Sequence, residues 1–169
     1  MQKRAVILET NAFIAGFGNI GITESFKTPA LNQIKINHKS GAGDTSVSTG
    51  TFESLDSEVT FKSLPKGVYE ELSKLDAAEI IHKKATRVGS VVESHEYICR
   101  GGMSIEYGEA KAGEFLDVKI TQKGLRAYTY EHNNKVVIDI DHDNGKAYVG
   151  GKDLAAEARK IVGSWLWIN

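Results

Sequence analysis

Two segments of the chain alternate apolar and polar residues with a period of two, and this pattern constrains the fold more than any other feature. They cover residues 32–38 and 57–64. Such alternation predicts β-strands, each with one apolar and one polar face. The apolar positions include Ile34, Ile36, Val59 and Phe61. The polar positions that alternate with them are Gln33, Lys35, Asn37, Glu58, Thr60 and Lys62.

Other strand-like segments follow one another in runs, and helices are expected at only two places. The later strand-like segments are residues 87–99, 115–123, 125–132 and 136–141, with a hairpin turn expected at Asn133-Asn134. The helical segments are residues 65–75 and 153–163; Asp153 is a good N-cap for the second. About seven or eight strands that do not alternate with helices indicate an α+β domain that is mainly antiparallel β, of the β-sandwich or barrel type.

The length of the chain favours one domain over residues 1–169, which ends in a short tail, residues 164–169, with Trp165 and Trp167. Between the two alternating segments lie residues 39–54, which are rich in Gly, Ser and Thr. We expect a long loop there, and loops of this length in compact domains are often functional. It is therefore a candidate contact loop between subunits or rings, with Gly41, Ala42, Gly43, Asp44 and Thr45 as its candidate contact residues.

The composition argues against several classes of function. A net charge of -1 gives no basic surface for tight binding to nucleic acid phosphates. Cys99 is the only cysteine, so no intrachain disulfide is possible, and a buried apolar role is expected. The five histidines lack the spacing of a zinc site. The acidic run at residues 139–143 lacks the glutamate that a calcium loop requires at its twelfth position.

No nucleophile-elbow sequence is present, so we expect no catalytic residue, no metal, no cofactor and no enzymatic activity. The apolar run near the N-terminus is too short for a signal-peptide core or a membrane span. Production in a cytosol and the absence of a membrane anchor are the corresponding expectations.

Several short motifs, taken in order, resemble the major tail tube protein of contractile-tailed bacteriophages. They include Thr28-Pro29-Ala30-Leu31, Gly41-Ala42-Gly43, residues 109–114 (Glu-Ala-Lys-Ala-Gly-Glu) and residues 151–154 (Gly-Lys-Asp-Leu). The resemblance covers about residues 10 to 163. The chain departs from the family pattern at Thr28, where leucine is usual, and in the extra residues 164–169.

The resemblance implies a structural protein whose hexameric rings join their sheets edge to edge and stack into a rigid inner tail tube, the conduit for DNA ejection. The implied partners are further copies of the chain, the tail sheath protein, the baseplate or tube initiator, the tape measure protein, and viral DNA that passes without sequence-specific binding. The implied location is the virion tail, after assembly in the host bacterial cytoplasm. The polar positions of the two alternating segments are the candidate lumen-facing residues.

Three alternatives remain open from the sequence. The same fold could form the inner tube of an R-type bacteriocin, an extracellular contractile injection system or a type VI secretion apparatus. A monomeric β-barrel that binds a small ligand would show an apolar pocket and no self-association. An enzyme is the third alternative, and the sequence offers no constellation of residues for it.

Overall fold

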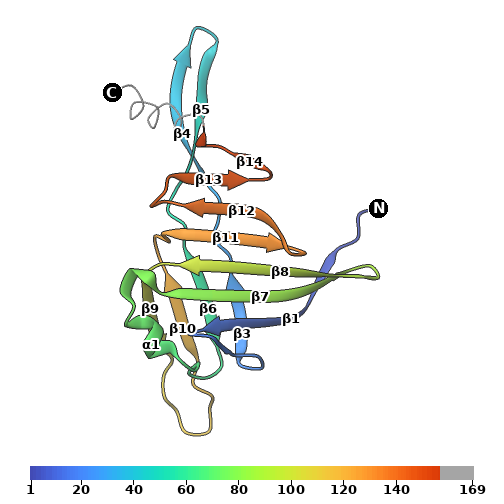
Figure 1. Ribbon diagram of the computed structural model, residues 1–169, viewed down its shortest axis with the longest axis vertical. Helices are drawn as coiled ribbons and strands as arrows, with labels where there is room; N and C mark the ends of the chain where they lie inside the picture. The colour runs from blue at the N-terminus through green and yellow to red at the C-terminus, as the bar shows by residue number, and fades with distance from the viewer. Residues whose placement is uncertain (157–169) are drawn as a thin grey trace, which may run out of the picture.

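The computed structural model describes residues 1–156, and their regular secondary structure is mainly antiparallel β. An eight-stranded sheet has the order β14-β13-β12-β11-β8-β7-β1-β2, a four-stranded sheet has the order β3-β6-β10-β9, and β4 pairs with β5 alone. In Figure 1 the four-stranded sheet lies behind the larger sheet and its strands cross the larger sheet at a steep angle. The β4–β5 hairpin extends beyond both sheets at the top of the view.

The elements have the following bounds. The eight-stranded sheet contains β1 (Ala5–Ile14), β2 (Phe17–Gly18), β7 (Glu79–Val88), β8 (Val91–Arg100), β11 (Ala127–His132), β12 (Lys135–Asp141), β13 (Lys146–Val149) and β14 (Lys152–Asp153). The four-stranded sheet contains β3 (Thr23–Lys27), β6 (Ser57–Phe61), β9 (Met103–Tyr107) and β10 (Val118–Gln122). The hairpin contains β4 (Gln33–Ser40) and β5 (Gly43–Phe52), and the helical elements are α1 (Val68–Leu72) and a 3-10 turn (Leu75–Ala77).

The core lies between the two larger sheets and divides into two hydrophobic clusters. In β6 the alternation predicted from the sequence is confirmed, because Val59 and Phe61 are buried while Glu58 and Thr60 are half-buried on the outer face. The first cluster joins β6 and β10 to β1 and β7 through Ala12, Ile14, Val59, Phe61, Val68, Ile80, Val118 and Ile120. The second lies nearer the hairpin and contains Phe52, Leu55, Tyr97, Cys99, Leu125, Tyr128, Ile140 and Ala147. These side chains fill the interior of the sandwich.

The α+β, mainly antiparallel fold class is confirmed, and so is the turn at Asn133-Asn134, where both residues adopt left-handed φ angles of 50° and 65°. The predicted helix at residues 65–75 is shorter than expected. Gly67, at φ 76°, precedes α1, and a Cβ atom at that position would lie 2.9 Å from the Cβ atom of Ala15. Glycine is therefore required there for backbone geometry and for space. The predicted C-terminal helix lies almost wholly outside the described residues, as do Trp165 and Trp167.

Two predictions of local structure were wrong. Residues 39–54 are not a long loop, because Gly43–Phe52 form β5, which pairs with β4 along its length. Residues 87–99 are not one strand, because the chain reverses at Gly89 between β7 and β8. In β5 the polar residues occupy both faces, so no alternation marks the strand. In the β7–β8 segment apolar residues flank the turn, so hydrophobicity does not mark the reversal.

Candidate assembly surfaces

The β4–β5 hairpin is the most exposed element, and we refer to residues 33–52 as the projecting hairpin. Every residue of β4 is exposed, as are most of those in β5. Its base is held by Phe52, which is buried in the second cluster, and by a hydrogen bond from the Glu53 N–H to the Asn32 carbonyl. The predicted contact residues Gly41, Ala42, Gly43, Asp44 and Thr45 lie at its tip, where β4 turns into β5. The structure therefore presents them at the end of a two-stranded ribbon instead of on a long loop.

One face of the projecting hairpin is apolar and has no partner within the described chain. Ile36 and Val47 lie directly opposite each other across the two strands, and their side chains are 63% and 58% exposed. Ile34, two residues before Ile36 on the same face, is also exposed. Three large aliphatic side chains together on an exposed ribbon form a surface that is better buried against another protein surface.

The other face of the projecting hairpin is polar. Lys35 lies opposite Ser48, Asn37 opposite Ser46, and Lys39 opposite Asp44. Gln33, Lys35 and Asn37, which the sequence analysis proposed as lumen-facing residues, all lie on β4. The hairpin is thus amphipathic across its thickness, with a solvated face and an apolar face.

The second surface is the outer face of the four-stranded sheet, which is polar and carries both charges. Glu58 and Thr60 point away from the core, and Glu58 forms an ion pair with Lys119 of the neighbouring strand β10 at 3.4 Å. Lys62 follows the end of β6 and is exposed. The remaining side chains on this face are Ser25, Lys27, Ser104, Glu106 and Thr121. Such a face attracts water and has no strong preference for either sign of charge.

The two groups of candidate lumen residues do not lie in one sheet. Glu58 and Thr60 belong to the four-stranded sheet, whereas Gln33, Lys35 and Asn37 belong to the projecting hairpin. The two are nevertheless continuous along the chain, because β4 follows β3 and β5 precedes β6 (Figure 1). The projecting hairpin therefore extends the side of the molecule that carries the four-stranded sheet.

The four-stranded sheet ends in two strands that each have a single partner. β3 pairs only with β6, and β9 pairs only with β10 among the described residues. All three pairings inside the sheet are antiparallel, so β3 and β9 run in opposite directions. The outer side of each leaves backbone donors and acceptors free, which is a template for pairing with another chain. If β9 of one copy met β3 of another, the new pairing would again be antiparallel.

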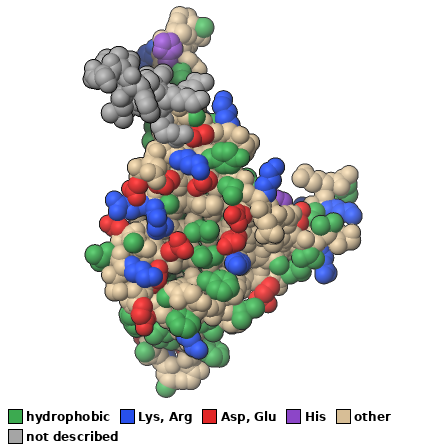
Figure 2. Space-filling model, viewed as in Figure 1, with side chains coloured by type: hydrophobic (Ala, Val, Ile, Leu, Met, Phe, Trp, Pro, Cys, Tyr) green, Lys and Arg blue, Asp and Glu red, His purple; other side chains and the backbone are tan. Residues whose placement is uncertain are grey.

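A third surface lies at the end of the eight-stranded sheet, where β1 begins and β7 turns into β8. Its exposed apolar side chains are Val6, Ile7, Leu8, Val91 and Val92. Figure 2 shows hydrophobic and basic side chains on this arm, whereas acidic and basic side chains are intermixed over the rest of the visible face. No patch of a single charge dominates this view.

Burial shifts the pKa values of two core side chains, Cys99 and His82. Burial raises the pKa of the Cys99 thiol to about 12, so it stays protonated and unreactive. Burial and the nearby Lys84 ammonium lower the pKa of His82 to about 4. His82 stacks on Phe26 inside the core and contacts the Thr10 hydroxyl. The expectation of a buried, small apolar role for Cys99 is confirmed.

One cluster of potential metal ligands was missed by the sequence analysis. Glu93, His95 and His132 are half-buried on one face of the eight-stranded sheet, and their ligand atoms all lie within 4.8 Å of one another. His95 and His132 are far apart in sequence but lie directly opposite in the β8–β11 pairing. Only knowledge of this strand register would have shown the cluster. The acidic residues near 139–143 instead end a strand, where the Asp141 carboxylate accepts hydrogen bonds from the Asp143 and Asn144 backbone N–H groups.

No helix among residues 1–156 has the length and apolarity needed to cross a membrane. A comparison with curated proteins finds no match. Two solved structures share the fold at a TM-score of 0.52. One is the tube-terminating cap of the anti-feeding prophage, with 14% identity over 73% of this chain and 87% of that chain. The other is the sheath/tube terminator of the PVC extracellular contractile injection system in its extended state, with 10% identity over 73% of this chain and 93% of that chain.

The family model described as phage tail tube protein FII matches residues 4–163. This range includes the projecting hairpin, both larger sheets and all four of the short motifs named above. Because the match spans nearly the whole sequence, the chain belongs to the phage tail tube protein FII family.

Proposed function

We propose that this chain is the subunit of the inner tail tube of a contractile phage tail, in which hexameric rings stack into a rigid conduit for DNA. The observation that carries the proposal is the four-stranded sheet, which has a polar outer face and two edges that are unpaired within residues 1–156. A sheet of this kind is completed by closing on itself around a ring of copies. Family membership supports a structural role in a tail.

Edge-to-edge closure of six copies would give a central channel wide enough for a DNA duplex. In the proposed ring, β9 of each copy pairs with β3 of the next, so six four-stranded sheets form one barrel of about 24 strands. With strands about 4.8 Å apart and tilted by about 40°, the backbone circle is about 48 Å across. Inward side chains that reach about 5 Å from each wall leave a lumen of about 38 Å. This width admits a DNA duplex.

The lumen wall in this arrangement is the polar face of the four-stranded sheet. Glu58, Thr60 and Lys62 would line it within a ring, and Gln33, Lys35 and Asn37 would extend the lining along the projecting hairpin. The mixed charge of this face, with the Lys119–Glu58 ion pair at its centre, supports the assignment. A wall that neutralised many phosphates would release counterions and hold the DNA, whereas a wall of mixed charge lets it slide.

The stacking contact is assigned to the projecting hairpin. Its tip, Gly41 to Thr45, would reach the neighbouring ring or subunit, and its apolar face would be buried there. A head-to-tail contact of this kind propagates along the tube axis, whereas the β9–β3 contact closes around it. The remaining proposed partners are the sheath protein outside the tube, the baseplate or tube initiator at one end, and the tape measure protein.

Paired cysteines on the free edges test ring closure. Ser25→Cys on β3 would be combined in turn with Ser104→Cys and with Glu106→Cys on β9; all three positions are exposed on the outer face. Mild oxidation of assembled protein should give a covalent ladder that ends at the closed hexamer on a denaturing gel. The native Cys99 does not interfere because its thiol is buried.

The single variant Ser25→Cys is the matched control, since one cysteine per copy can link at most two chains. If both double variants gave nothing larger than dimers while rings were visible by electron microscopy, edge-to-edge closure through β3 and β9 would be wrong. If no rings formed at all, the tube proposal itself would fail.

A second candidate is a tube that carries no viral DNA, as in an extracellular contractile injection system. The observation that favours it is the fold shared with a tube cap and a sheath/tube terminator of such particles. Particles purified with this protein would distinguish the two. Nuclease-protected DNA in them supports the phage tail, and intact contractile particles without DNA or a capsid support the second candidate.

A further inference from the structure

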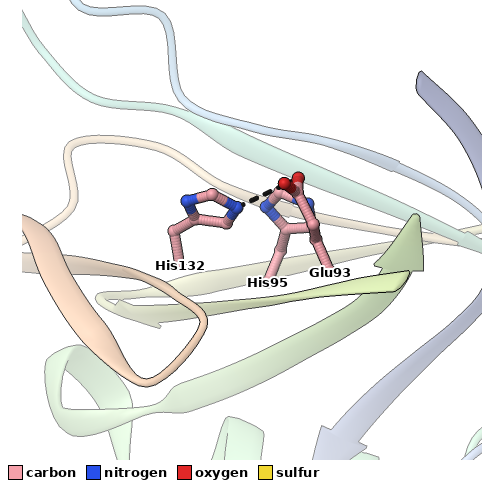
Figure 3. A group of neighbouring side chains, drawn as sticks. All are labelled: Glu93, His95 and His132. Atoms are coloured by element: carbon pink, nitrogen blue, oxygen red, sulfur yellow. Dashed lines mark hydrogen bonds and ion pairs between the residues drawn. The ribbon is translucent and has the colours of Figure 1, made fainter. Parts of the chain in front are cut away.

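The register of two strands brings three metal-binding side chains to one face of the eight-stranded sheet. His95 of β8 lies opposite His132 of β11, and Glu93 lies two residues before His95 on the same strand. Figure 3 shows the three side chains pointing to the same side of the sheet, with the Glu93 carboxylate next to both imidazole rings. His95 and His132 are each paired with neighbouring strands on both sides, so their backbone positions are fixed, whereas Glu93 is paired, among the described residues, only with Thr86 of β7.

The spacing of the ligand atoms suits a small divalent ion. His132 Nε2 and Glu93 Oε2 are 3.1 Å apart. Two ligand atoms on one tetrahedral zinc ion, each bonded at about 2.0 Å, are separated by about 3.3 Å. The atoms of all three residues lie within 4.8 Å of one another, so the imidazole of His95 has to approach by at most about 1.5 Å. Rotation of the Glu93 side chain about its three torsions supplies part of that movement.

His95 also has the surroundings of a metal ligand. Its Nε2 is 2.8 Å from the Thr86 hydroxyl and its Nδ1 is 2.7 Å from the Tyr130 hydroxyl. A histidine that binds a metal through one nitrogen usually donates its other ring N–H to an outer-shell acceptor, which fixes the orientation of the ring. Either hydroxyl can accept that hydrogen bond while the other gives way to the ion.

One basic side chain, Lys84 of β7, lies directly opposite His95 in the β7–β8 pairing. The Lys84 ammonium does not occupy the site, because it lies over the ring of Tyr97, 5.2 Å from the ring centre.

We propose that Glu93, His95 and His132 form a binding site for a divalent transition metal of the zinc class, which links β8 to β11. Two imidazoles and one carboxylate are a ligand set that zinc accepts, with a fourth position left for water. This site is independent of the tube proposal, since all three ligands come from one chain. A bound ion would tie together two strands of the sheet outside the hydrophobic clusters.

The test is calorimetric titration of Zn²⁺ into the full-length protein without a polyhistidine tag, paired with thermal unfolding. The wild-type protein should bind one ion per chain and unfold at a higher temperature when the ion is present. His132→Ala and Glu93→Gln should each weaken binding by more than about tenfold, since loss of an outer-shell partner alone costs about 10- to 100-fold. Glu93→Gln keeps the shape of the side chain, so it separates ligand loss from misfolding.

His142→Ala is the matched control, because His142 is an exposed histidine outside the cluster, and it should bind as the wild type does. Ca²⁺ and Mg²⁺, which prefer all-oxygen sites, should give no comparable signal. Failure of the wild-type protein to bind one equivalent of Zn²⁺ would overturn the proposal. Binding that was unchanged in both His132→Ala and Glu93→Gln would overturn it as well.

Discussion

Ile36→Glu is expected to abolish tube assembly while the folded subunit survives. Ile36 is 63% exposed in the single chain, so the substitution removes little burial from the monomer. In the tube, the apolar face of the projecting hairpin would be covered, and burial of an isoleucine side chain is worth about 1.5–3 kcal/mol. Because only the exposed 63% of Ile36 can be newly buried, loss of that contact alone raises the critical concentration for assembly about 5- to 30-fold. A buried, unpaired carboxylate raises it further. Sedimentation across a concentration series measures the change.

Ser48→Glu is the matched control for this prediction. Ser48 lies opposite Lys35 on the polar face of the same hairpin, so the added charge is the same but stays in water. It should leave the critical concentration within a few-fold of the wild-type value. If the two variants assembled equally well, the apolar face of the projecting hairpin would not be a stacking contact.

Phe61→Ala is expected to lower the free energy of unfolding by about 3–5 kcal/mol, because it removes a large side chain from the centre of a packed core. Phe61 is fully buried in the first hydrophobic cluster, where β6 and β10 pack against β1 and β7. A loss of this size is a large part of the stability of a typical domain. Urea denaturation of the unassembled subunit measures it.

Phe115→Ala removes the same atoms from a side chain that is 86% exposed, and it should change the free energy of unfolding by less than about 0.5 kcal/mol. Equal losses for the two variants would show that the sandwich interior does not hold the sheets together.

The strands β4 and β6 could be predicted from the sequence because apolar and polar residues alternate along them. In β6 the buried residues Val59 and Phe61 alternate with polar ones, and the period of two identified the strand. In β5 nearly every residue is exposed, so burial does not impose an alternating pattern on its sequence. Its Gly, Ser and Thr residues indicate a loop instead of a strand. The turn at Asn133-Asn134 was predictable because its geometry demands left-handed residues.

The candidate surfaces were predictable only to the extent that they are local in sequence. The tip of the projecting hairpin, Gly41 to Thr45, was identified as a contact site, and that role stays a prediction. The free edges β3 and β9 depend on which strands pair, and the cluster of Glu93, His95 and His132 depends on register. Neither the strand pairing nor the register can be deduced from the spacing of residues along the chain. The family is one of structural tail tube proteins, which agrees with the expectation of a non-enzymatic role.

Electron microscopy of the purified protein, before and after addition of a baseplate template, tests the central claim most directly. The account predicts rings of six subunits and stacked tubes whose central channel is about 38 Å wide, as edge-to-edge closure of the four-stranded sheets requires. A protein that stayed a monodisperse monomer at high concentration, with and without the template, would contradict it.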